Sequence, residues 1–277
     1  MQEEKQTQAM DIVRLARDTK RPTTLDYIKF MIRDFLELHG DRRYSNDLAI
    51  VAGVGFLDDI PVTIIGHQKG RNVKENVKRN FGMAHPEGYR KALRLMEEAE
   101  RFGRPVINLI DTPGAYPGIG AEERGQAEAI AYNLYKMSTL RTPIISLITG
   151  EGGSGGALAL GTADRVYMLS NTIYSVISPE GCASILWRDS TKANEAAEAL
   201  KLTAGDLYEF EIIDGIIEEP AEGAHKDYEA MAKKIKSVLV PALKELLALD
   251  VETLLERRYD KYRRMGVYSE GDGVPSQ

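Results

Sequence analysis

The chain has 277 residues, of which 43% are hydrophobic and 28% charged, with a formal net charge of −6 at pH 7. This length suffices for one large α/β core, and the acidic balance argues against a general nucleic-acid or anionic-membrane binder, because binding phosphates needs a basic face. A single cysteine, Cys182, excludes an internal disulfide and a four-cysteine zinc site, so we expect no metal in this chain.

Residues 1–40 are predicted to form an N-terminal helical segment. Thr23 and Thr24 are typical of an N-cap, and the apolar residues after them recur at helical spacing and predict one helix ending at Gly40: Leu25, Ile28, Ile32, Phe35 and Leu36. The stretch from Met1 to Lys20 is too charged for a secretory signal, and no apolar run reaches the roughly 20 residues of a membrane span. We therefore expect a soluble, cytoplasmic protein.

Residues 41–225 are predicted to form the core, and residues 226–277 a helical extension with a frayed tail from Gly266. The repeated order of strand, turn and helix indicates a mainly parallel sheet with right-handed crossovers. In chain order we expect a hairpin of strands 48–56 and 61–66, a helix from 86 to 103, a strand at 105–110, a helix at about 122–140, a strand at 143–149, a short helix from 155, strands at 165–169 and 173–177, and helices at 178–187 and 194–202.

Two glycine-rich turns follow predicted strands. Residues 150–157 read Gly-Glu-Gly-Gly-Ser-Gly-Gly-Ala, and residues 111–120 carry glycines at 114, 118 and 120. Glycine lets backbone N–H groups at a helix start approach a bound oxygen closely. Because parallel strands end at one edge of a sheet, we expect both turns to form one site that stabilises negatively charged oxygen.

Other interpretations of residues 150–157 fit less well. The run lacks the lysine of a phosphate-binding P-loop and the acidic residue that a dinucleotide-binding fold places about 20 residues later. Gly152, Ser154 and Gly156 also match the Gly-x-Ser-x-Gly pattern of serine hydrolases, for which His225 is the one downstream histidine. A serine hydrolase using Ser154 and a non-catalytic scaffold that docks a carrier protein both stay open as alternatives.

Seven segments closely resemble the carboxyltransferase alpha subunits of bacterial acetyl-CoA carboxylases. Residues 111–118, for example, read Asp-Thr-Pro-Gly-Ala-Tyr-Pro-Gly; the others are 66–70, 79–83, 86–93, 121–126, 150–157 and 174–187. The likeness extends from about Arg21 to Arg264. It implies a crotonase-type (ClpP/crotonase-like) fold, a superhelix of strand–strand–helix turns, with helical extensions at both ends.

The resemblance also implies an activity and partners. The activity is transfer of a carboxyl group from carboxybiotin to acetyl-CoA, giving malonyl-CoA in the first committed step of fatty-acid biosynthesis. The partners are a zinc-ribbon beta subunit in an α2β2 heterotetramer, the biotin carboxyl carrier protein that carries the biotin covalently, and, indirectly, biotin carboxylase. The resemblance further associates the chain with nucleotide and ATP binding.

On this interpretation the site consists of backbone groups. We expect the amides of Gly152, Gly153, Gly155 and Gly156 to form an oxyanion hole, in which each donor is worth about 3 kcal/mol. We expect the substrate to be bound by Gly114, Ala115, Tyr116, Gly118, Lys69 and Arg71. The two cations belong to a basic cluster, Lys69, Arg71, Lys74, Lys78 and Arg79, which favours either a solvated face or capture of an acidic or phosphorylated ligand.

Overall fold

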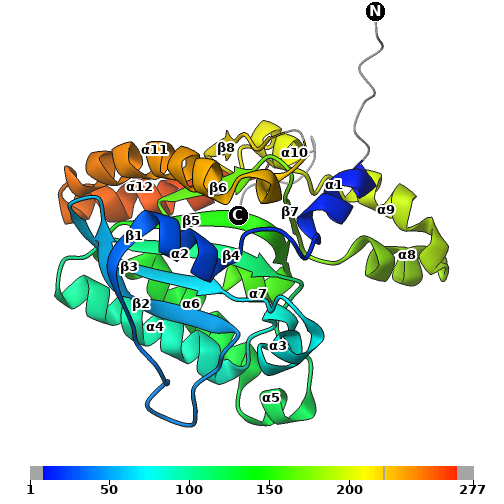
Figure 1. Ribbon diagram of the computed structural model, residues 1–277, viewed down its shortest axis with the longest axis horizontal. Helices are drawn as coiled ribbons and strands as arrows, with labels where there is room; N and C mark the ends of the chain where they lie inside the picture. Colours follow the sequence, from blue (N-terminus) through cyan, green and yellow to red (C-terminus); the bar gives the residue numbers. More distant parts are fainter. Residues whose placement is uncertain (1–8, 221, 267–277) are drawn as a thin grey trace, which may run out of the picture.

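The computed structural model describes residues 9–220 and 222–266, which form a mixed α/β fold around one eight-stranded sheet (Figure 1). The strand order is β1-β2-β3-β4-β5-β6-β8, and β7 pairs with β5 outside this path. The pairs β1–β2 and β2–β3 are antiparallel, and all others are parallel. The strands are β1 (Ile32–Glu37), β2 (Ile50–Leu57), β3 (Ile60–His67), β4 (Val106–Thr112), β5 (Ile144–Gly153), β6 (Arg165–Leu169), β7 (Ile173–Ser175) and β8 (Gly215–Ile217).

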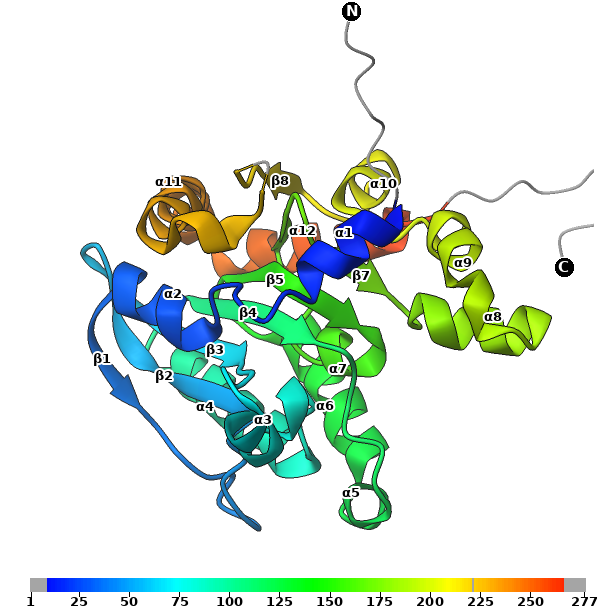
Figure 2. The ribbon, with the colours of Figure 1, turned by 45° about the vertical axis from the view of Figure 1, so that its right-hand side comes forward.

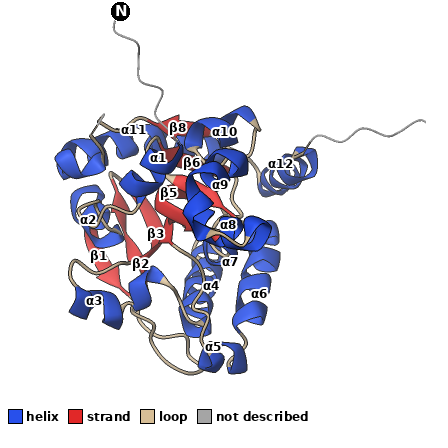
Figure 3. Cartoon of the chain, turned by 90° about the vertical axis from the view of Figure 1, so that its right-hand side faces the viewer, coloured by secondary structure: helices blue, strands red, loops and turns tan. Residues whose placement is uncertain are grey.

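Helices cover both faces of the sheet (Figure 3). One face packs on α4 (Pro86–Arg101), α6 (Gln126–Thr139) and α7 (Ser154–Leu158), and the other on α2 (Thr24–Met31) and α11 (Tyr228–Leu247). A strand between two such layers is buried on both sides, and every residue of β4 is buried. The remaining helices are α1 (Ala9–Ala16), α3 (Val73–Lys78), α5 (Ile119–Glu123), α8 (Pro179–Trp187), α9 (Ala193–Leu200), α10 (Ala204–Glu209) and α12 (Val251–Arg264).

Helices α8 and α9 extend sideways from the body, and α1 lies against α9 (Figures 1 and 2). Val13 of α1 and Ala197 of α9 are fully buried in the small apolar cluster between them. The N-terminal helix is thereby brought to the edge where the parallel strands end, although it lies far from those strands in sequence.

The single helix predicted from Leu25 to Gly40 is wrong beyond Met31. Helix α2 ends there, and Ile32–Glu37 form the edge strand β1, antiparallel to β2. The close pairing depends on two glycines in β2, since a Cβ at Gly53 would lie 2.3 Å from the carbonyl oxygen of Leu36 and one at Gly55 2.4 Å from the Ile32 side chain. Strand pairing therefore overrides the helical spacing of the apolar residues.

Two further predictions need correction in detail. Strand β5 continues to Gly153 instead of ending at 149, so three of the five glycines belong to a strand. The helix predicted at about 122–140 is broken at Gly125, whose φ of 83° requires a residue without Cβ, into α5 and α6. The hairpin and the helix opened by Pro86 are confirmed. Elements α3, α10 and β8 were not predicted, the tail 267–277 lies outside the described residues, and the domain boundaries stay a prediction.

Candidate active site

The two glycine turns contact each other backbone to backbone at the carboxyl ends of β4 and β5. A Cβ at Gly153 would lie 2.2 Å from the carbonyl oxygen of Pro113, and one at Gly156 would lie 2.6 Å from the amide nitrogen of Ala115. Such distances are incompatible with a side chain, so glycine is required at both positions for the turns to meet. The predicted convergence of the turns is confirmed.

The structure separates the predicted amide donors into paired and unpaired groups. Gly152 and Gly153 lie within β5 and pair with β7, and the N–H of Gly114 donates to the Thr112 hydroxyl at 3.1 Å. By contrast, the first-turn N–H groups of α7, which include Gly155 and Gly156, have no acceptor within the helix. Ala115 lies beside them, and its N–H makes no hydrogen bond within the described residues. The free donors therefore come from Ala115, Gly155 and Gly156.

Tyr116 and Gly118 lie at the outer side of this site. The Tyr116 ring stacks on His85 with ring centroids 4.1 Å apart. The backbone N–H of Tyr116 donates to the carbonyl oxygen of Ala84. Gly118 precedes α5, and a Cβ there would lie 2.3 Å from the Tyr116 ring. Both residues thus stabilise the conformation of the turn at residues 111–120.

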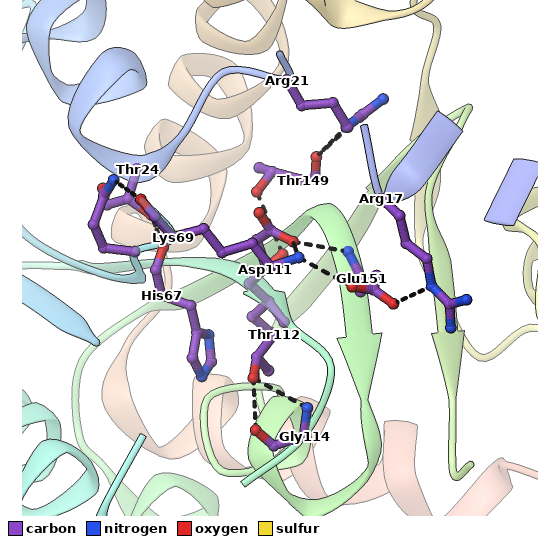
Figure 4. A network of polar contacts seen from close by, with 12 residues as sticks. Arg17, Arg21, Thr24, His67, Lys69, Asp111, Thr112, Gly114, Thr149 and Glu151 are labelled. Atoms are coloured by element: carbon purple, nitrogen blue, oxygen red, sulfur yellow. Dashed lines mark hydrogen bonds and ion pairs between the residues drawn. The ribbon is translucent and has the colours of Figure 1, made fainter. Parts of the chain in front are cut away.

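A chain of ion pairs lies next to the turns, at the ends of β4 and β5 (Figure 4). The Lys69 ammonium group lies 2.7 Å from Asp111 Oδ1 and 3.1 Å from Glu151 Oε2, while Arg17, which directly follows α1, lies 2.7 Å from Glu151 and 2.7 Å from Glu180 of α8. Burial alone lowers the pKa of Lys69, but the two carboxylates outweigh it and raise that pKa above its usual value. Lys69 is therefore charged at neutral pH.

Asp111 connects the two turns directly. Its Oδ1 accepts the N–H of Glu151 at 3.0 Å and lies 2.3 Å from the position of a Cβ on Gly150. The carboxylate thus occupies the space that a side chain at Gly150 would fill. This contact is one of the links between the ends of β4 and β5.

Arg71 and Arg21 anchor the segment between α1 and α2. Arg71 pairs with Asp26 and donates to the carbonyl oxygens of Thr19 and Arg21. The buried Arg21 forms an ion pair of 2.6 Å with Glu219 and donates to the Thr149 carbonyl oxygen of β5. The two cations predicted to bind substrate, Lys69 and Arg71, are accordingly both engaged within the chain.

His67 is fully buried at the end of β3, and neither ring nitrogen has a hydrogen-bond partner among the residues that the structure describes. Burial, with a smaller contribution from the charge of Lys69, lowers the pKa of His67 to about 3. The imidazole is therefore neutral near pH 7. It is also a weak base at that pH.

This lowered pKa predicts a loss of stability in acid that His67→Gln should reduce. Between pH 6.5 and 3 the unfolded chain binds a proton at residue 67 and the folded chain does not, so the free energy of unfolding falls as the pH falls. From pH 6.5 to 5 the wild type should lose about 2 kcal/mol more than the variant in urea unfolding. Parallel curves for the two proteins over this range would contradict the assignment.

Ser154 lies at the strand-to-helix junction with a φ of 47°, a strained angle for a residue other than glycine. With Gly155 it lines an apolar cavity of about 390 Å³, whose other walls include Leu158, Tyr174 and Val176. No histidine or carboxylate lines this cavity, and no hydrogen bond joins Ser154 to a histidine within the described residues. Neither the serine-hydrolase nor the scaffold interpretation gains support.

Sequence reasoning missed the supporting residues Arg17, Glu151 and Glu180. Asp111 and Glu151 each follow a long apolar run, which places them where buried strands end, and this was the available signal. Their pairing with Lys69 and with an N-terminal helix depends on tertiary packing. Among residues 9–220 and 222–266, no helix is long and apolar enough to cross a membrane, and no group of histidine, cysteine and acidic residues could hold a metal ion.

Several solved structures share this fold at low sequence identity. A transcarboxylase 12S structure matches with a TM-score of 0.64 and 21% identity over 96% of this chain and 46% of the other. A Pseudomonas malonate decarboxylase hetero-tetramer in complex with coenzyme A matches with a TM-score of 0.62 and 20% identity over 80% of this chain and 91% of the other. The crotonase-type fold predicted from the resemblance is confirmed.

Sequence comparisons reach much higher identity. The chain is 62% identical to the acetyl-coenzyme A carboxylase carboxyl transferase subunit alpha of Geobacter metallireducens, over 94% of this chain and 81% of that protein. It is 56% identical to the subunit of the same name from Listeria monocytogenes, over 94% and 82%. A family model described as "Acetyl co-enzyme A carboxylase carboxyltransferase-like" matches residues 2–266. The chain therefore belongs to the acetyl co-enzyme A carboxylase carboxyltransferase-like family.

Proposed function

We propose that this chain is the alpha-type subunit of a carboxyltransferase that transfers a carboxyl group to acetyl-CoA and forms malonyl-CoA. Family membership and the high identity to subunits of that name support the proposal. The observation that carries it from the structure is the contact between the two glycine turns, which collects unpaired backbone N–H groups at one edge of the sheet. The comparisons give no support for nucleotide or ATP binding.

The turns fit a ligand that develops negative charge on oxygen. When bound, a carrier-linked carboxybiotin supplies the carboxyl group and a ureido oxygen on which charge accumulates. The N–H groups of Gly155, Gly156 and Ala115 would donate to that oxygen, and a preorganised donor of this kind is worth about 3 kcal/mol in comparable sites. Gly152, Gly153 and Gly114, whose backbones pair internally, would hold the donors in place, as would Tyr116 and Gly118.

The cations have a different role in this proposal. Lys69 and Arg71 bind carboxylates and carbonyl oxygens of their own chain, so we assign them to positioning the site. We assign no side chain of this chain as a base, since His67 is neutral and buried and, within residues 9–220 and 222–266, no carboxylate lines the cavity beside Ser154. When bound, the biotin group would supply the proton acceptor for acetyl-CoA, held in place by the donors named above.

The subunit name of its relatives supports a multisubunit enzyme. We propose an α2β2 assembly with a zinc-ribbon beta subunit that brings the binding site for acetyl-CoA, together with a biotin carboxyl carrier protein and, indirectly, biotin carboxylase, in the cytoplasm. The test is carboxyl transfer to acetyl-CoA by the chain co-purified with its beta subunit and biotinylated carrier. Malonyl-CoA formed by the assembly and not by the chain alone supports the proposal, and its absence from a folded assembly refutes it.

Replacing Ser154 distinguishes this function from ester hydrolysis. Ser154→Ala should retain carboxyl transfer within about twofold, because the backbone N–H groups remain and the hydroxyl takes no part in the reaction. If Ser154 were a nucleophile, its replacement would lower the rate of the reaction by several orders of magnitude. Labelling with a fluorophosphonate probe gives an independent readout, and we expect none at residue 154. A labelled Ser154 would overturn the assignment.

A further inference from the structure

A second cavity, of about 280 Å³, lies away from the glycine turns and is lined by residues of α12, of β6 and of the end of α11. Its charged lining has five cations, Arg165, Arg257, Arg258, Lys261 and Arg264, and two carboxylates, Asp164 and Asp214; leucines 246, 249 and 254 form its apolar wall. A half-open cavity with excess positive charge, in which Arg257 and Arg264 are exposed to solvent, raises the local concentration of anions.

Two of the five cations have structural partners that account for them. Arg258 is almost fully buried, binds Asp164 through two hydrogen bonds of 2.7 and 2.8 Å, and donates to carbonyl oxygens of the last turn of α6 and of the loop that follows it. Lys261 pairs with Asp214. These two ion pairs use both carboxylates that line the cavity.

The other three cations exceed what the carboxylates neutralise. Arg165 shares Asp214 at 3.7 Å and reaches Glu245 at 2.9 Å outside the cavity. Within the described residues Arg257 has no ion pair or hydrogen bond, and Arg264 donates only through Nε to the carbonyl oxygen of Asp260. At least two guanidinium groups therefore retain most of their donors for a ligand.

A helix C-terminus attracts basic residues, but this effect explains only part of the cluster. It is confined to the last turn of a helix, which holds Lys261 and Arg264. Arg257 lies about two turns earlier, and Arg165 comes from β6. Burial, assisted by the charge of Arg165, lowers the pKa of Lys261 although Asp214 opposes the shift. The cavity thus has more positive charge than the C-terminus of α12 accounts for.

We propose that this cavity is a binding site for a diphosphate group, held by Arg257 and Arg264 with Arg165 and Lys261 behind them. Planar guanidinium groups bind phosphate oxygens with two parallel hydrogen bonds, and the volume accommodates two phosphoryl groups. The cavity shares Asp214, Lys261 and Arg264 with an adjoining one of about 450 Å³, which leaves room for the rest of a larger molecule; Glu209 and Glu211 also line the adjoining cavity, so the part of the ligand held there would not be anionic. The site goes beyond the proposed carboxyl transfer, since none of its residues belongs to the glycine turns.

The test is calorimetric titration of the full chain with inorganic pyrophosphate at low salt, comparing wild type with Arg257→Gln/Arg264→Gln. We expect the double variant to bind pyrophosphate about tenfold more weakly or worse. Arg263→Gln is the matched control, since Arg263 is an exposed arginine of the same helix outside the cavity, and it should bind as wild type does. Equal binding by the double variant and wild type, or no binding by folded wild type, would overturn the proposal.

A second titration identifies the source of the diphosphate. If the group belongs to CoA, CoA should bind more tightly than pyrophosphate and lose affinity in the double variant, whereas a free anion predicts no gain from the rest of CoA. Binding is measured directly and does not depend on turnover. The result is therefore separable from that of the carboxyl-transfer assay.

Discussion

Gly155→Val should abolish most carboxyl transfer while leaving the fold and subunit assembly intact. A Cβ at Gly155 meets only the Ile130 side chain, at 3.7 Å, and the glycine has no positive φ, so the backbone accepts a branched residue. The valine methyl groups would instead cover the N–H groups at the start of α7. Loss of one or two donors lowers kcat by about 100- to 1,000-fold or more, as measured by malonyl-CoA formation in the assembled enzyme.

Gly205→Val is the matched control for this substitution. Gly205 also lies in the first turn of a short helix, α10, and a Cβ there meets only the Thr203 hydroxyl, at 3.9 Å. Both variants lose similar helix propensity, but only residue 155 lies at the glycine turns. Near-normal turnover in a folded Gly155→Val assembly would refute the role of these amides.

The second large effect is expected at Lys69. Lys69→Met leaves the carboxylates of Asp111 and Glu151 close together without their shared cation, each about 10% exposed. Removing one partner from such a buried network costs about 3 kcal/mol of unfolding free energy, measurable in urea. Because Asp111 also binds the Glu151 N–H, repulsion between the carboxylates should displace the glycine run and lower kcat.

Kinetics separate this positioning role from direct substrate binding. A lysine that only bound substrate would raise KM for acetyl-CoA and leave kcat unchanged, whereas a positioning lysine lowers kcat and stability together. Lys69→Arg should restore part of both, since it keeps the charge. Lys74→Met, an exposed lysine of the same basic cluster, should change neither. An increase confined to KM would contradict the positioning role.

The sequence predicted the elements whose patterns are local. Pro86 at a helix start, the hairpin around Asp58 and Asp59, and the strand before Asp111 were recognisable because capping, turn and burial patterns act within a few residues. Strand β1 was mistaken for helix because its conformation depends on the edge of β2, whose glycines 53 and 55 gave the only sign of a close neighbour.

The candidate site was predicted in position but not in detail. Spacing of glycines after two strands located both turns, since parallel strands end at one edge of a sheet. Which N–H groups stay free depends on β5 pairing with β7 and on the Thr112 hydroxyl, neither of which is apparent from the run itself. The ion-pair partners of Lys69 could not be predicted either, because they lie on two strands distant in sequence and the basic cluster itself gives no sign of them.

The most direct test is a crystal structure of the assembled enzyme with a biotin derivative bound. The account predicts that the ureido oxygen lies about 2.7 to 3.1 Å from at least two of the amide nitrogens of Ala115, Gly155 and Gly156, with no charged side chain of this chain in contact with it. A ureido oxygen held by a side chain such as Lys69, or bound beyond hydrogen-bond distance of all three nitrogens, would contradict it.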